Sequence, residues 1–392
     1  MKILQVFDFF SLQHGGGIVN LVYQISRALM QKGHEVSIYT SDFELDQDYI
    51  NSLRGVNVYD FHCWSSLAGF YLMPGMIGET KRNLKDFDII HLHCLRSFQN
   101  IVIYHYAKKY GVPYVLDTHG SIPVTEKRRL KWLFDVTFGN RILRDASGCI
   151  AETELGVGEY KDVNVNPDKI VLITPPFPVD DFSQLPQKGH FRSKYNIKEK
   201  HIIMFLGRIN RIKGLDFLVE SFFELTKDRK DIILVIVGPD DGYKSTLVGL
   251  IDKLNLSSKV LFTGFLGGEK KLSALVDADV VVQTSRYEHG TGVPFEAILC
   301  NTPIIVSKGT GSSENVSRVE AGYLVEFGNK KELKDTMQNI LNNPAEAMFK
   351  TQTAKEYIIN NLSMEKNVEK YEMMYMDCIL RRENHKLGSR IT

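Results

Sequence analysis

The feature that most constrains the fold is an alternation of short apolar runs with helical patterns along most of the chain. Runs rich in Ile, Leu and Val are followed by glycine-containing loops, and then by segments with the 3.6-residue apolar period of a helix. One such unit has an apolar run at 2–7, a glycine loop at 14–17 and a helical pattern at 18–30. This order is typical of α/β proteins, because parallel strands need crossover connections.

The alternation places strands and helices along both halves of the chain. In the first half we expect further strands at 35–39, 56–59, 88–92, 114–117, 148–151 and 170–173, and helices at 101–110 and 127–143. In the second half we expect strands at 202–206, 232–237, 260–262, 280–282, 304–306 and 323–325, and helices at 215–225, 330–342, 345–359 and 364–382. The run at 232–237 is almost purely aliphatic, which favours a parallel sheet covered on both faces.

A proline-rich segment, TPPFPVDD at 174–181, separates the two halves and suits neither a strand nor a helix. A chain of 392 residues also exceeds the usual size of one hydrophobic core. We therefore predict an α/β protein with two Rossmann-like, doubly wound parallel-sheet domains at 1–178 and 179–362. A C-terminal helix in 363–392 is expected to pack back on the first domain. Ligands are expected in a cleft at the carboxyl ends of the strands.

Composition excludes several classes of protein. The net charge of +1 provides no general attraction to nucleic acid. Five scattered cysteines without a C-x-x-C pair indicate a reducing compartment, and no spacing of His and Cys fits a zinc site. The chain enters a strand directly after Met1, and no continuous apolar stretch reaches the ~20 residues of a membrane span. These observations favour a cytoplasmic protein.

The most informative stretch is 285–303, SRYEHGTGVPFEAILCNTP. A glycine loop leads into a helix that begins near Val293, with Pro294 in its first turn, where proline is favoured. Backbone N–H groups at such a helix start suit a phosphate. Glu288 and Glu296 would repel a phosphate, so we expect them to accept hydrogen bonds from hydroxyls. A phosphate site flanked by two such acceptors fits a sugar nucleotide. The alternative is that Glu296 merely complements the helix dipole and Glu288 is a solvated loop charge.

A second loop, GRINRIKG at 207–214, carries Arg208 and Lys213. A guanidinium and an ammonium on one loop can hold a diphosphate without a metal ion. The sequence has no Asp-x-Asp motif placed to chelate one, so we expect no metal and no other cofactor. The alternative is a loop whose cations are simply solvated.

Taken together, these motifs resemble the retaining glycosyltransferase family 4, which has the GT-B fold. The resemblance rests on GRINRIKG, EHGTGVPFEA and TPIIVS in the second half, and on GGGIVNLV, LMQKGHEV, DIIHLH and DTHG in the first. It extends from Met1 to about Phe327, and the ordered set is far more specific than any single motif. It implies a donor site formed by Gly16, Gly17, Arg208, Lys213, Glu288, Gly290, Thr291, Gly292, Val293 and Glu296.

The resemblance also implies a role for each side chain. Arg208 and Lys213 would bind the donor pyrophosphate and stabilise the leaving nucleotide. Glu288 would contact hydroxyls of the donor sugar, Glu296 would hold the ribose, and His119 would lie near the sugar. Attack from the face that the nucleotide leaves, with the departing phosphate taking the proton, would need no protein base. On chemical grounds His119 remains an alternative general base.

Two departures from the family pattern stand out. The usual Gly-Phe-Gly after the first glutamate is replaced by His289-Gly290-Thr291-Gly292, so the glycines are displaced by one position. This change is expected to affect the phosphate amides and the choice of sugar. Asn301 stands where glycine usually ends the helix, a harmless exchange because asparagine tolerates the left-handed conformation.

A basic amphipathic helix at 127–144 is a candidate acceptor or membrane surface. Such a helix suits an anionic membrane or a lipid-phosphate acceptor; the alternative is a solvated face above a packed stripe. The residues proposed for this surface are Lys127, Arg128, Arg129, Lys131 and Trp132. The charge-free segment 61–78 is either a packed helix and loop or an apolar wall for the acceptor.

We therefore predict a metal-independent retaining hexosyltransferase. It would move sugar from a UDP- or GDP-sugar to a hydroxyl of a free or lipid-linked glycan, at the inner face of a membrane if the basic helix docks there. A sugar-nucleotide epimerase would need a pair of acid–base carboxylates, which we do not find. A non-catalytic nucleotide-sugar binding subunit should have lost a donor residue, yet all are present. A dehydrogenase could use Asp42 for the ribose, but the second domain would then lack a purpose.

Overall fold

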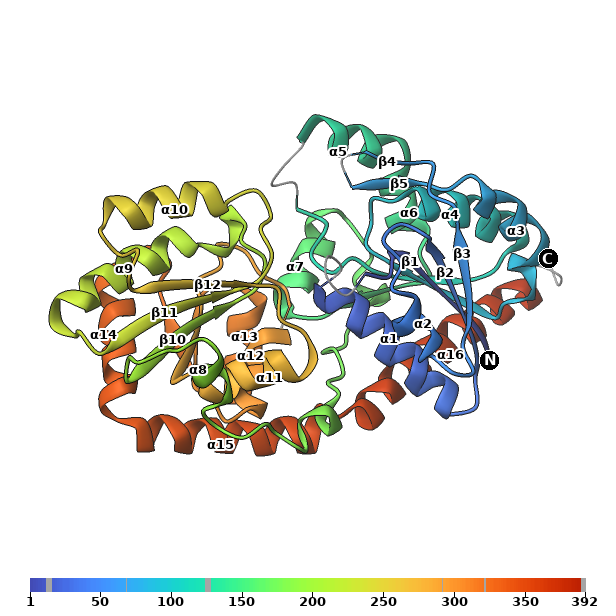
Figure 1. Ribbon diagram of the computed structural model, residues 1–392. Coiled ribbons are helices and arrows are strands. Elements are labelled where there is room, and N and C mark those ends of the chain that lie inside the picture. The colour runs from blue at the N-terminus through green and yellow to red at the C-terminus, as the bar shows by residue number, and fades with distance from the viewer. Residues whose placement is uncertain (12–15, 68, 124–127, 291, 321, 389–392) are drawn as a thin grey trace. The chain divides into compact units, whose positions relative to one another are not determined.

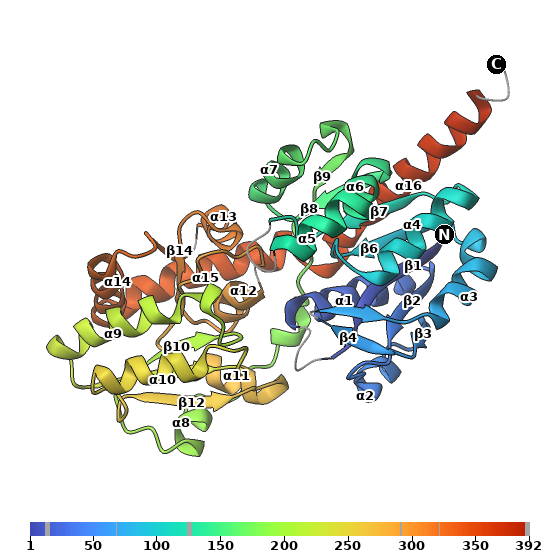
Figure 2. The ribbon, with the colours of Figure 1, turned by 90° about the horizontal axis from the view of Figure 1, so that it is seen from above.

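The computed structural model describes residues 1–11, 16–67, 69–123, 128–290, 292–320 and 322–388 (Figures 1 and 2). It forms two compact units, of which unit 1 combines Met1–Pro176 with Met364–Thr392 and unit 2 comprises Phe177–Ser363. The sequence had placed these boundaries at 178/179 and 362/363. Both units are α/β with parallel sheets, which confirms the predicted fold class.

Unit 1 is built on a seven-stranded sheet with the order β3-β2-β1-β6-β7-β8-β9, in which every paired strand is parallel. The strands are β1 (Lys2–Phe9), β2 (Glu35–Ser41), β3 (Asn57–Phe61), β6 (Ile89–His93), β7 (Tyr114–Asp117), β8 (Gly148–Ala151) and β9 (Ile170–Leu172). β1 lies between β2 and β6, so the winding of the chain reverses at its carboxyl end.

Helices cover both faces of this sheet. They are α1 (Gly16–Gln31), α2 (Gln47–Asn51), α3 (Gly75–Asn83), η1 (Leu84–Asp86), α4 (Phe98–Tyr110), α5 (Arg128–Phe134), η2 (Asp135–Gly139), α6 (Asn140–Asp145), α7 (Glu154–Asp162), η3 (Pro167–Lys169) and α16 (Met364–Gly388). Apolar side chains of α3, α4, α6 and α7 form the core on one face. α1 and α16 pack side by side on the other face (Figure 1). The last helix of the chain therefore belongs to the first unit.

The structure differs from the expected elements at two places in unit 1. Segment 61–78 is not a helix and loop: it contains an antiparallel hairpin of β4 (Ser65–Leu67) and β5 (Phe70–Leu72), and α3 begins only at Gly75. The expected single helix at 127–143 is interrupted by the π-helical turn η2. Its Asp135 accepts two hydrogen bonds from the Arg96 guanidinium, at 2.8 and 2.7 Å, which ties the π turn to the start of α4.

Unit 2 has a six-stranded parallel sheet with the order β12-β11-β10-β13-β14-β15. The strands are β10 (His201–Leu206), β11 (Ile232–Val237), β12 (Val260–Gly264), β13 (Val280–Gln283), β14 (Ile304–Ser307) and β15 (Tyr323–Val325). β10 lies between β11 and β13, so the winding reverses at its carboxyl end as well.

The helices of unit 2 also form two layers. They are η4 (Val179–Phe182), α8 (His190–Lys194), η5 (Arg211–Lys213), α9 (Leu215–Asp228), α10 (Lys244–Lys253), α11 (Gly268–Asp277), α12 (Gly292–Leu299), α13 (Gly311–Arg318), α14 (Lys330–Asn342) and α15 (Pro344–Asn361). α9, α10 and α14 supply the core on one face, and α8, α11, α12, α13 and α15 supply it on the other. All six residues of β11 are buried, as its aliphatic composition predicted.

The switch points locate the expected ligand sites. Loops that follow β1, β10 and β13 leave the carboxyl edge of each sheet next to the strand where the winding reverses. In doubly wound sheets, ligands bind at this position. The predicted residues Gly16, Gly17, Arg208, Lys213 and Glu288 lie in or directly after these loops.

Candidate functional site

Two loops of unit 2 are locked together at the carboxyl ends of β10 and β13. The backbone N–H of Arg286 donates to the carbonyl oxygen of Ile212 at 2.8 Å, and the Thr284 hydroxyl donates to that of Gly214 at 3.0 Å. Gly214 has φ = 65°, and a Cβ there would lie 1.9 Å from the carbonyl oxygen of Thr284. Only glycine allows so close an approach, so this residue holds the 207–214 loop against the 285–303 stretch.

Arg286 fastens the same two loops and was not recognised from the sequence. Its guanidinium donates to both carboxylate oxygens of Asp216, at 3.0 and 2.5 Å, and to the carbonyl oxygen of Arg211 at 2.6 Å. It also lies 4.8 Å from the centre of the Phe327 ring. Burial of Asp216 raises the pKa of its carboxyl, while the Arg286 guanidinium lowers it. The net result is a lowered pKa for Asp216.

Where the 207–214 loop meets the 285–303 stretch, the structure brings Lys213 and Glu288 together. The Lys213 ammonium pairs with Oε2 of Glu288, and the two side chains are 18% and 20% exposed. The other oxygen, Oε1, accepts a hydrogen bond from the backbone N–H of Gly290 at 3.2 Å. An ammonium has three donors, so Lys213 can hold Glu288 and still present N–H groups to a phosphate oxygen.

Arg208 is not part of that pair. Its guanidinium donates to Oδ2 of Asp241 at 2.7 Å and is 54% exposed. The side-chain amide of Asn210 donates to the same Asp241 oxygen at 3.1 Å. Asn210 also caps η5 by accepting from the N–H of Ile212 at 2.9 Å, which shapes the loop between the two cations.

The loop after Glu288 is fastened to α13. The carbonyl oxygen of Glu288 accepts from the N–H of Gly311 at 2.7 Å, and that of Gly290 accepts from the Ser312 hydroxyl. Thr291 lies outside the described residues. At the point where the glycines are displaced from the family pattern, the chain carries a buried ring. His289 packs beside Tyr287, with ring centres 5.3 Å apart.

α12 begins at Gly292, one residue from the expected start, and places Val293 in its first turn. Glu296, on the same helix, forms an ion pair with Lys271 of α11 at 2.7 Å. Glu296 thus pairs with a different cation from Glu288, and its second carboxylate oxygen has no hydrogen-bond partner among the described residues.

In unit 1, Gly16 and Gly17 form the start of α1, while Gly15 and the rest of the preceding loop lie outside the described residues. Gly16 has φ = 58°, in the left-handed region that favours glycine. A Cβ at either position would meet nothing within 4 Å. Among the described residues nothing crowds this helix start, whose N–H groups suit an anion.

His119 also lies in unit 1, two residues beyond the end of β7, with φ = 46°. Its Nδ1 lies 2.8 Å from Oε1 of Glu152 and 3.3 Å from Oδ1 of Asp117. Burial opposes a charged imidazole, but the carboxylates of Asp117 and Glu152 outweigh it and raise the pKa of His119 to about 8.

The second ring nitrogen of His119 is occupied as well. Nε2 lies 2.9 Å from Nδ1 of His93, and the His119 side chain is only 2% exposed. An imidazole with this pKa is protonated at neutral pH and cannot then accept a proton. The two carboxylates near Nδ1 thus favour the positively charged form of His119.

Asp117, His119 and Glu152 are also the one group among the described residues with three metal-ligand atoms within 4.8 Å of one another. Hydrogen bonds already account for their arrangement, because Nδ1 of His119 pairs with Glu152 at 2.8 Å and the backbone N–H of His119 donates to Oδ1 of Asp117 at 3.1 Å. In the sequence, only the DTHG motif pointed to Asp117, and no motif pointed to Glu152. Glu152 directly follows β8, and its distance in the sequence from His119 shows no recognisable pattern.

The proposed acceptor or membrane surface is exposed. We define the α5 surface as Arg128, Arg129, Leu130, Trp132 and Leu133, all of which are exposed. Lys131 of the same helix is half-buried, and Lys127 lies outside the described residues. Trp132 is 64% exposed, so it does not serve as core, whereas Phe134 at the end of the same helix packs against the core of unit 1. Among the described residues, no helix is long and apolar enough to cross a bilayer.

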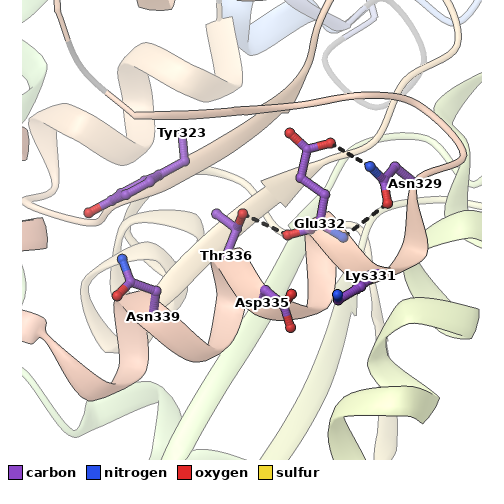
Figure 3. Close-up of a pocket in the computed structure, with 7 residues that line it drawn as sticks. All are labelled: Tyr323, Asn329, Lys331, Glu332, Asp335, Thr336 and Asn339. Carbon is purple, nitrogen blue, oxygen red and sulfur yellow. Dashed lines mark hydrogen bonds between the residues drawn. The ribbon is translucent and has the colours of Figure 1, made fainter.

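A cavity of about 470 Å³ lies elsewhere in unit 2, between β15 and α14 (Figure 3). Tyr323, Glu332 and Asp335 are among the residues that line it, and none of the predicted site residues does so. Its carboxylates disfavour a phosphate, so we do not assign the donor site there.

Comparison with known proteins agrees with the division into two units. Residues 15–181 match the family described as Glycosyltransferase Family 4, and residues 187–360 match the family described as Glycosyl transferases group 1. An uncharacterized glycosyltransferase of Methanocaldococcus jannaschii is 26% identical over 383 residues, 92% of each chain. The N-acetyl-alpha-D-glucosaminyl L-malate synthase of Bacillus anthracis is 22% identical over 384 residues, 95% of this chain and 96% of that one.

Solved structures share the fold. Anabaena HepE in complex with UDP and glucose superposes with a TM-score of 0.79 at 17% identity, covering 95% of this chain and 98% of that one. Sucrose-phosphate synthase from Thermosynechococcus elongatus gives a TM-score of 0.76 at 19% identity, covering 97% and 100%. Two parallel-sheet α/β units with this likeness define a GT-B glycosyltransferase. The chain belongs to glycosyltransferase family 4 and is a transferase enzyme.

Proposed function

We propose that this enzyme transfers a sugar from a UDP- or GDP-sugar to a hydroxyl of a glycan acceptor, with retention of configuration and without a metal ion. The observation that carries the proposal is the Lys213–Glu288 pair, which joins the 207–214 loop to the 285–303 stretch of unit 2. It places a cation suited to phosphate directly beside a carboxylate suited to hydroxyls, at the switch point of the sheet. Anabaena HepE, which shares the fold, binds UDP-glucose.

In this proposal Lys213 and Arg208 stabilise the diphosphate as the bond between the sugar C1 and the phosphate oxygen breaks. Fixed positive charge acts here where negative charge develops, which is the role a divalent ion would otherwise have. Glu288 accepts hydrogen bonds from hydroxyls of the donor sugar. Glu296, held by Lys271, accepts hydrogen bonds from the ribose. The first turn of α12 supplies backbone N–H groups to the phosphates, and in unit 1 the start of α1 at Gly16 and Gly17 offers groups of the same kind.

The acceptor oxygen attacks C1 from the face that the nucleotide leaves, and the departing phosphate takes the acceptor proton. This route retains the configuration and requires no neutral histidine as base. A protonated His119 is consistent with it, because a buried imidazolium adds positive charge to unit 1 without accepting a proton.

The test is an incubation with a panel of UDP-, GDP- and ADP-sugars and a mixture of glycan acceptors, with released nucleotide measured with and without EDTA. We expect one nucleotide class to be turned over at the same rate in both conditions. Loss of activity in EDTA, restored by a divalent ion, would contradict the metal-free proposal. Absence of binding and release for every donor would contradict the donor assignment.

We further propose that the α5 surface docks on an anionic membrane that carries a lipid-linked acceptor. Exposed Leu130, Trp132 and Leu133 adjoin Arg128 and Arg129, the combination that binds lipid headgroups and the acyl boundary together. Phosphatidylglycerol vesicles should therefore bind the protein more strongly than phosphatidylcholine vesicles.

The matched comparison uses two exposed aromatic residues. Trp132→Ser should reduce co-sedimentation with phosphatidylglycerol vesicles several-fold, as should Arg128→Gln with Arg129→Gln. Phe349→Ser should not, although Phe349 of unit 2 is 71% exposed. Equal binding to both kinds of vesicle, or equal effects of Trp132→Ser and Phe349→Ser, would contradict the docking surface.

A further inference from the structure

Buried side chains of unit 1 form a hydrogen-bonded chain from His119 to the C-terminal helix. Nε2 of His119 lies 2.9 Å from Nδ1 of His93, and Nε2 of His93 lies 2.7 Å from Oε1 of Gln5. Nε2 of Gln5 then lies 3.5 Å from the Tyr375 hydroxyl, the longest step. That hydroxyl lies 2.7 Å from Nδ1 of His91. His93, Gln5, Tyr375 and His91 are all almost completely buried.

The chain crosses neighbouring elements that the topology brings together. Gln5 lies on β1 and His93 at the end of β6, while His119 and Glu152 follow β7 and β8, so four adjacent strands contribute. Tyr375 comes from α16, which is 370 residues from Gln5 in the sequence. The predicted donor and acceptor residues include none of these side chains except His119.

The donors and acceptors from Glu152 to Tyr375 are mutually consistent when His119 is protonated. His119 then donates from Nδ1 to Glu152 and from Nε2 to His93, whose Nδ1 must accept. His93 consequently carries its proton on Nε2 and donates it to the carbonyl oxygen of Gln5. The Gln5 amide donates to Tyr375, whose hydroxyl proton is left to bond Nδ1 of His91.

A neutral His119 fits the reverse order of donors and acceptors along these hydrogen-bonded side chains. If His93 carried its proton on Nδ1, it would face the Nε2 proton of a protonated His119, and two donors would meet. His93 can adopt that tautomer when the Gln5 amide turns over and presents its NH₂ group to Nε2 of His93. The orientation of Gln5 is therefore coupled to the proton on His119. In the orientation seen here, the Gln5 amide donates to the Tyr375 hydroxyl.

We propose that His93, Gln5 and Tyr375 are positioning residues that keep His119 protonated and fixed in orientation during sugar transfer. The inference rests on the proposed function for its catalytic meaning, but not for the hydrogen bonds themselves. It makes the C-terminal helix a contributor to the charge of the reacting face, beyond its role in packing.

The charged and titratable groups around His119 agree with this assignment. The carboxylates of Asp117 and Glu152 face its Nδ1 and favour the cation. Burial lowers the pKa of His91 and of His93 well below the ordinary value, so neither competes for the proton. Burial raises the pKa of the nearby Cys94 thiol well above its ordinary value, so that group stays neutral.

The test compares two tyrosines of the same helix. Tyr375→Phe removes the hydroxyl that contacts Gln5 and His91. Tyr371→Phe removes a hydroxyl that has no hydrogen-bond partner among the described residues, from an equally buried ring. Gln5→Met removes the acceptor of His93 and retains the volume of the side chain. In each protein the His119 ring is titrated by NMR with ¹³C-labelled histidine, assigned by the signal lost in His119→Asn.

We expect the pKa of His119 to fall by about one pH unit in Gln5→Met, the size of one hydrogen bond expressed as a protonation equilibrium. It should fall by a smaller amount in Tyr375→Phe and stay unchanged in Tyr371→Phe. The decline of kcat at high pH should move down by the same amounts. Should Gln5→Met fail to fold, the two tyrosine variants decide the question.

An unchanged His119 titration in Tyr375→Phe and Gln5→Met, or equal shifts in Tyr375→Phe and Tyr371→Phe, would overturn the proposal. The NMR measurement needs no substrate, so it separates the two claims. The expected shifts in a protein that binds no sugar nucleotide would support the hydrogen-bonded chain and contradict the proposed function.

Discussion

The Lys213 ammonium and the Glu288 carboxylate form an ion pair between two loops that lie 75 residues apart in the sequence. Neither loop could hold this geometry alone. Gly214 permits their contact, and Arg286 fastens it through Asp216 and the carbonyl oxygen of Arg211. Both charges are consequently in place before a donor arrives, which reduces the reorganisation needed at the moment of reaction.

Replacing Lys213 with methionine should lower kcat for transfer by about 10²–10³-fold, the usual cost of losing one group that stabilises developing charge. The methionine preserves the aliphatic stem but leaves Glu288 without its partner. Steady-state kinetics with the preferred donor measure the effect. Lys198→Met, at an exposed position of unit 2, is the control and should behave like the unchanged enzyme.

Replacing Glu288 and replacing Glu296 should affect different steps of the reaction. Glu288→Gln should lower kcat while the Kd of the free nucleoside diphosphate stays nearly constant, since Glu288 is assigned to the sugar. Glu296→Gln should raise that Kd by about tenfold, the order of one charge-assisted hydrogen bond, since Glu296 is assigned to the ribose. Calorimetry with the nucleotide and kinetics with the donor distinguish them. Reversed effects would exchange the two assignments.

Gly214→Ala should destabilise unit 2 by about 3 kcal/mol, because its Cβ would lie 1.9 Å from the carbonyl oxygen of Thr284. Gly242→Ala is a matched control: its φ is 81°, also left-handed, but a Cβ there meets nothing within 4 Å. That change should cost about 1 kcal/mol, the backbone strain alone. Urea unfolding gives both free energies, and similar values would show that the loop contact is dispensable.

Asp8, at the end of β1, should make the stability of unit 1 depend on pH. Burial raises the pKa of Asp8 to about 7, while a hydrogen bond from the Gln99 amide opposes that rise. The folded state thus keeps a proton that the unfolded state releases near pH 4. This contribution to stability is lost as pH rises towards 7 and beyond.

Asp8→Asn can still accept from Gln99 but does not titrate. It should match the unchanged protein at pH 4 and be more stable by about 2 kcal/mol at pH 8, after allowance for the partial exposure of the carboxyl. Urea unfolding at the two pH values tests this. A variant that is less stable at pH 8 would show that the carboxylate itself is needed.

The parallel-sheet framework could be predicted from the sequence because strands buried on both faces are nearly pure aliphatic runs. Single-residue geometry was also accessible where one residue type has a distinct conformational preference. Asn301 has φ = 60° and takes the left-handed position expected when it replaces glycine. The hairpin at 65–72 escaped prediction because its strands are only three residues each, too short to show a period.

Side-chain partners were the part that sequence could not supply. Arg286 with Asp216, Arg208 with Asp241, and His119 with Glu152 join residues from separate crossover units. No spacing rule connects such pairs, since they depend on which loop ends the sheet order places side by side. For Arg208, Lys213, Glu288 and Glu296, residue type indicated the class of ligand group and the resemblance assigned the individual roles, while the structure adds the partner of each side chain.

Because α16 is made after unit 2 yet packs on the first sheet, unit 1 has no complete hydrophobic core until α16 has been synthesised. Tyr371 and Tyr375 cover β-strand residues such as Ile3 and Ile150, which emerge from the ribosome far earlier. Unit 2 is continuous in the sequence and can fold in the meantime. A truncated product that lacks the last helix would thus have a finished second unit and an open face on the first, which would expose incomplete chains to proteolysis.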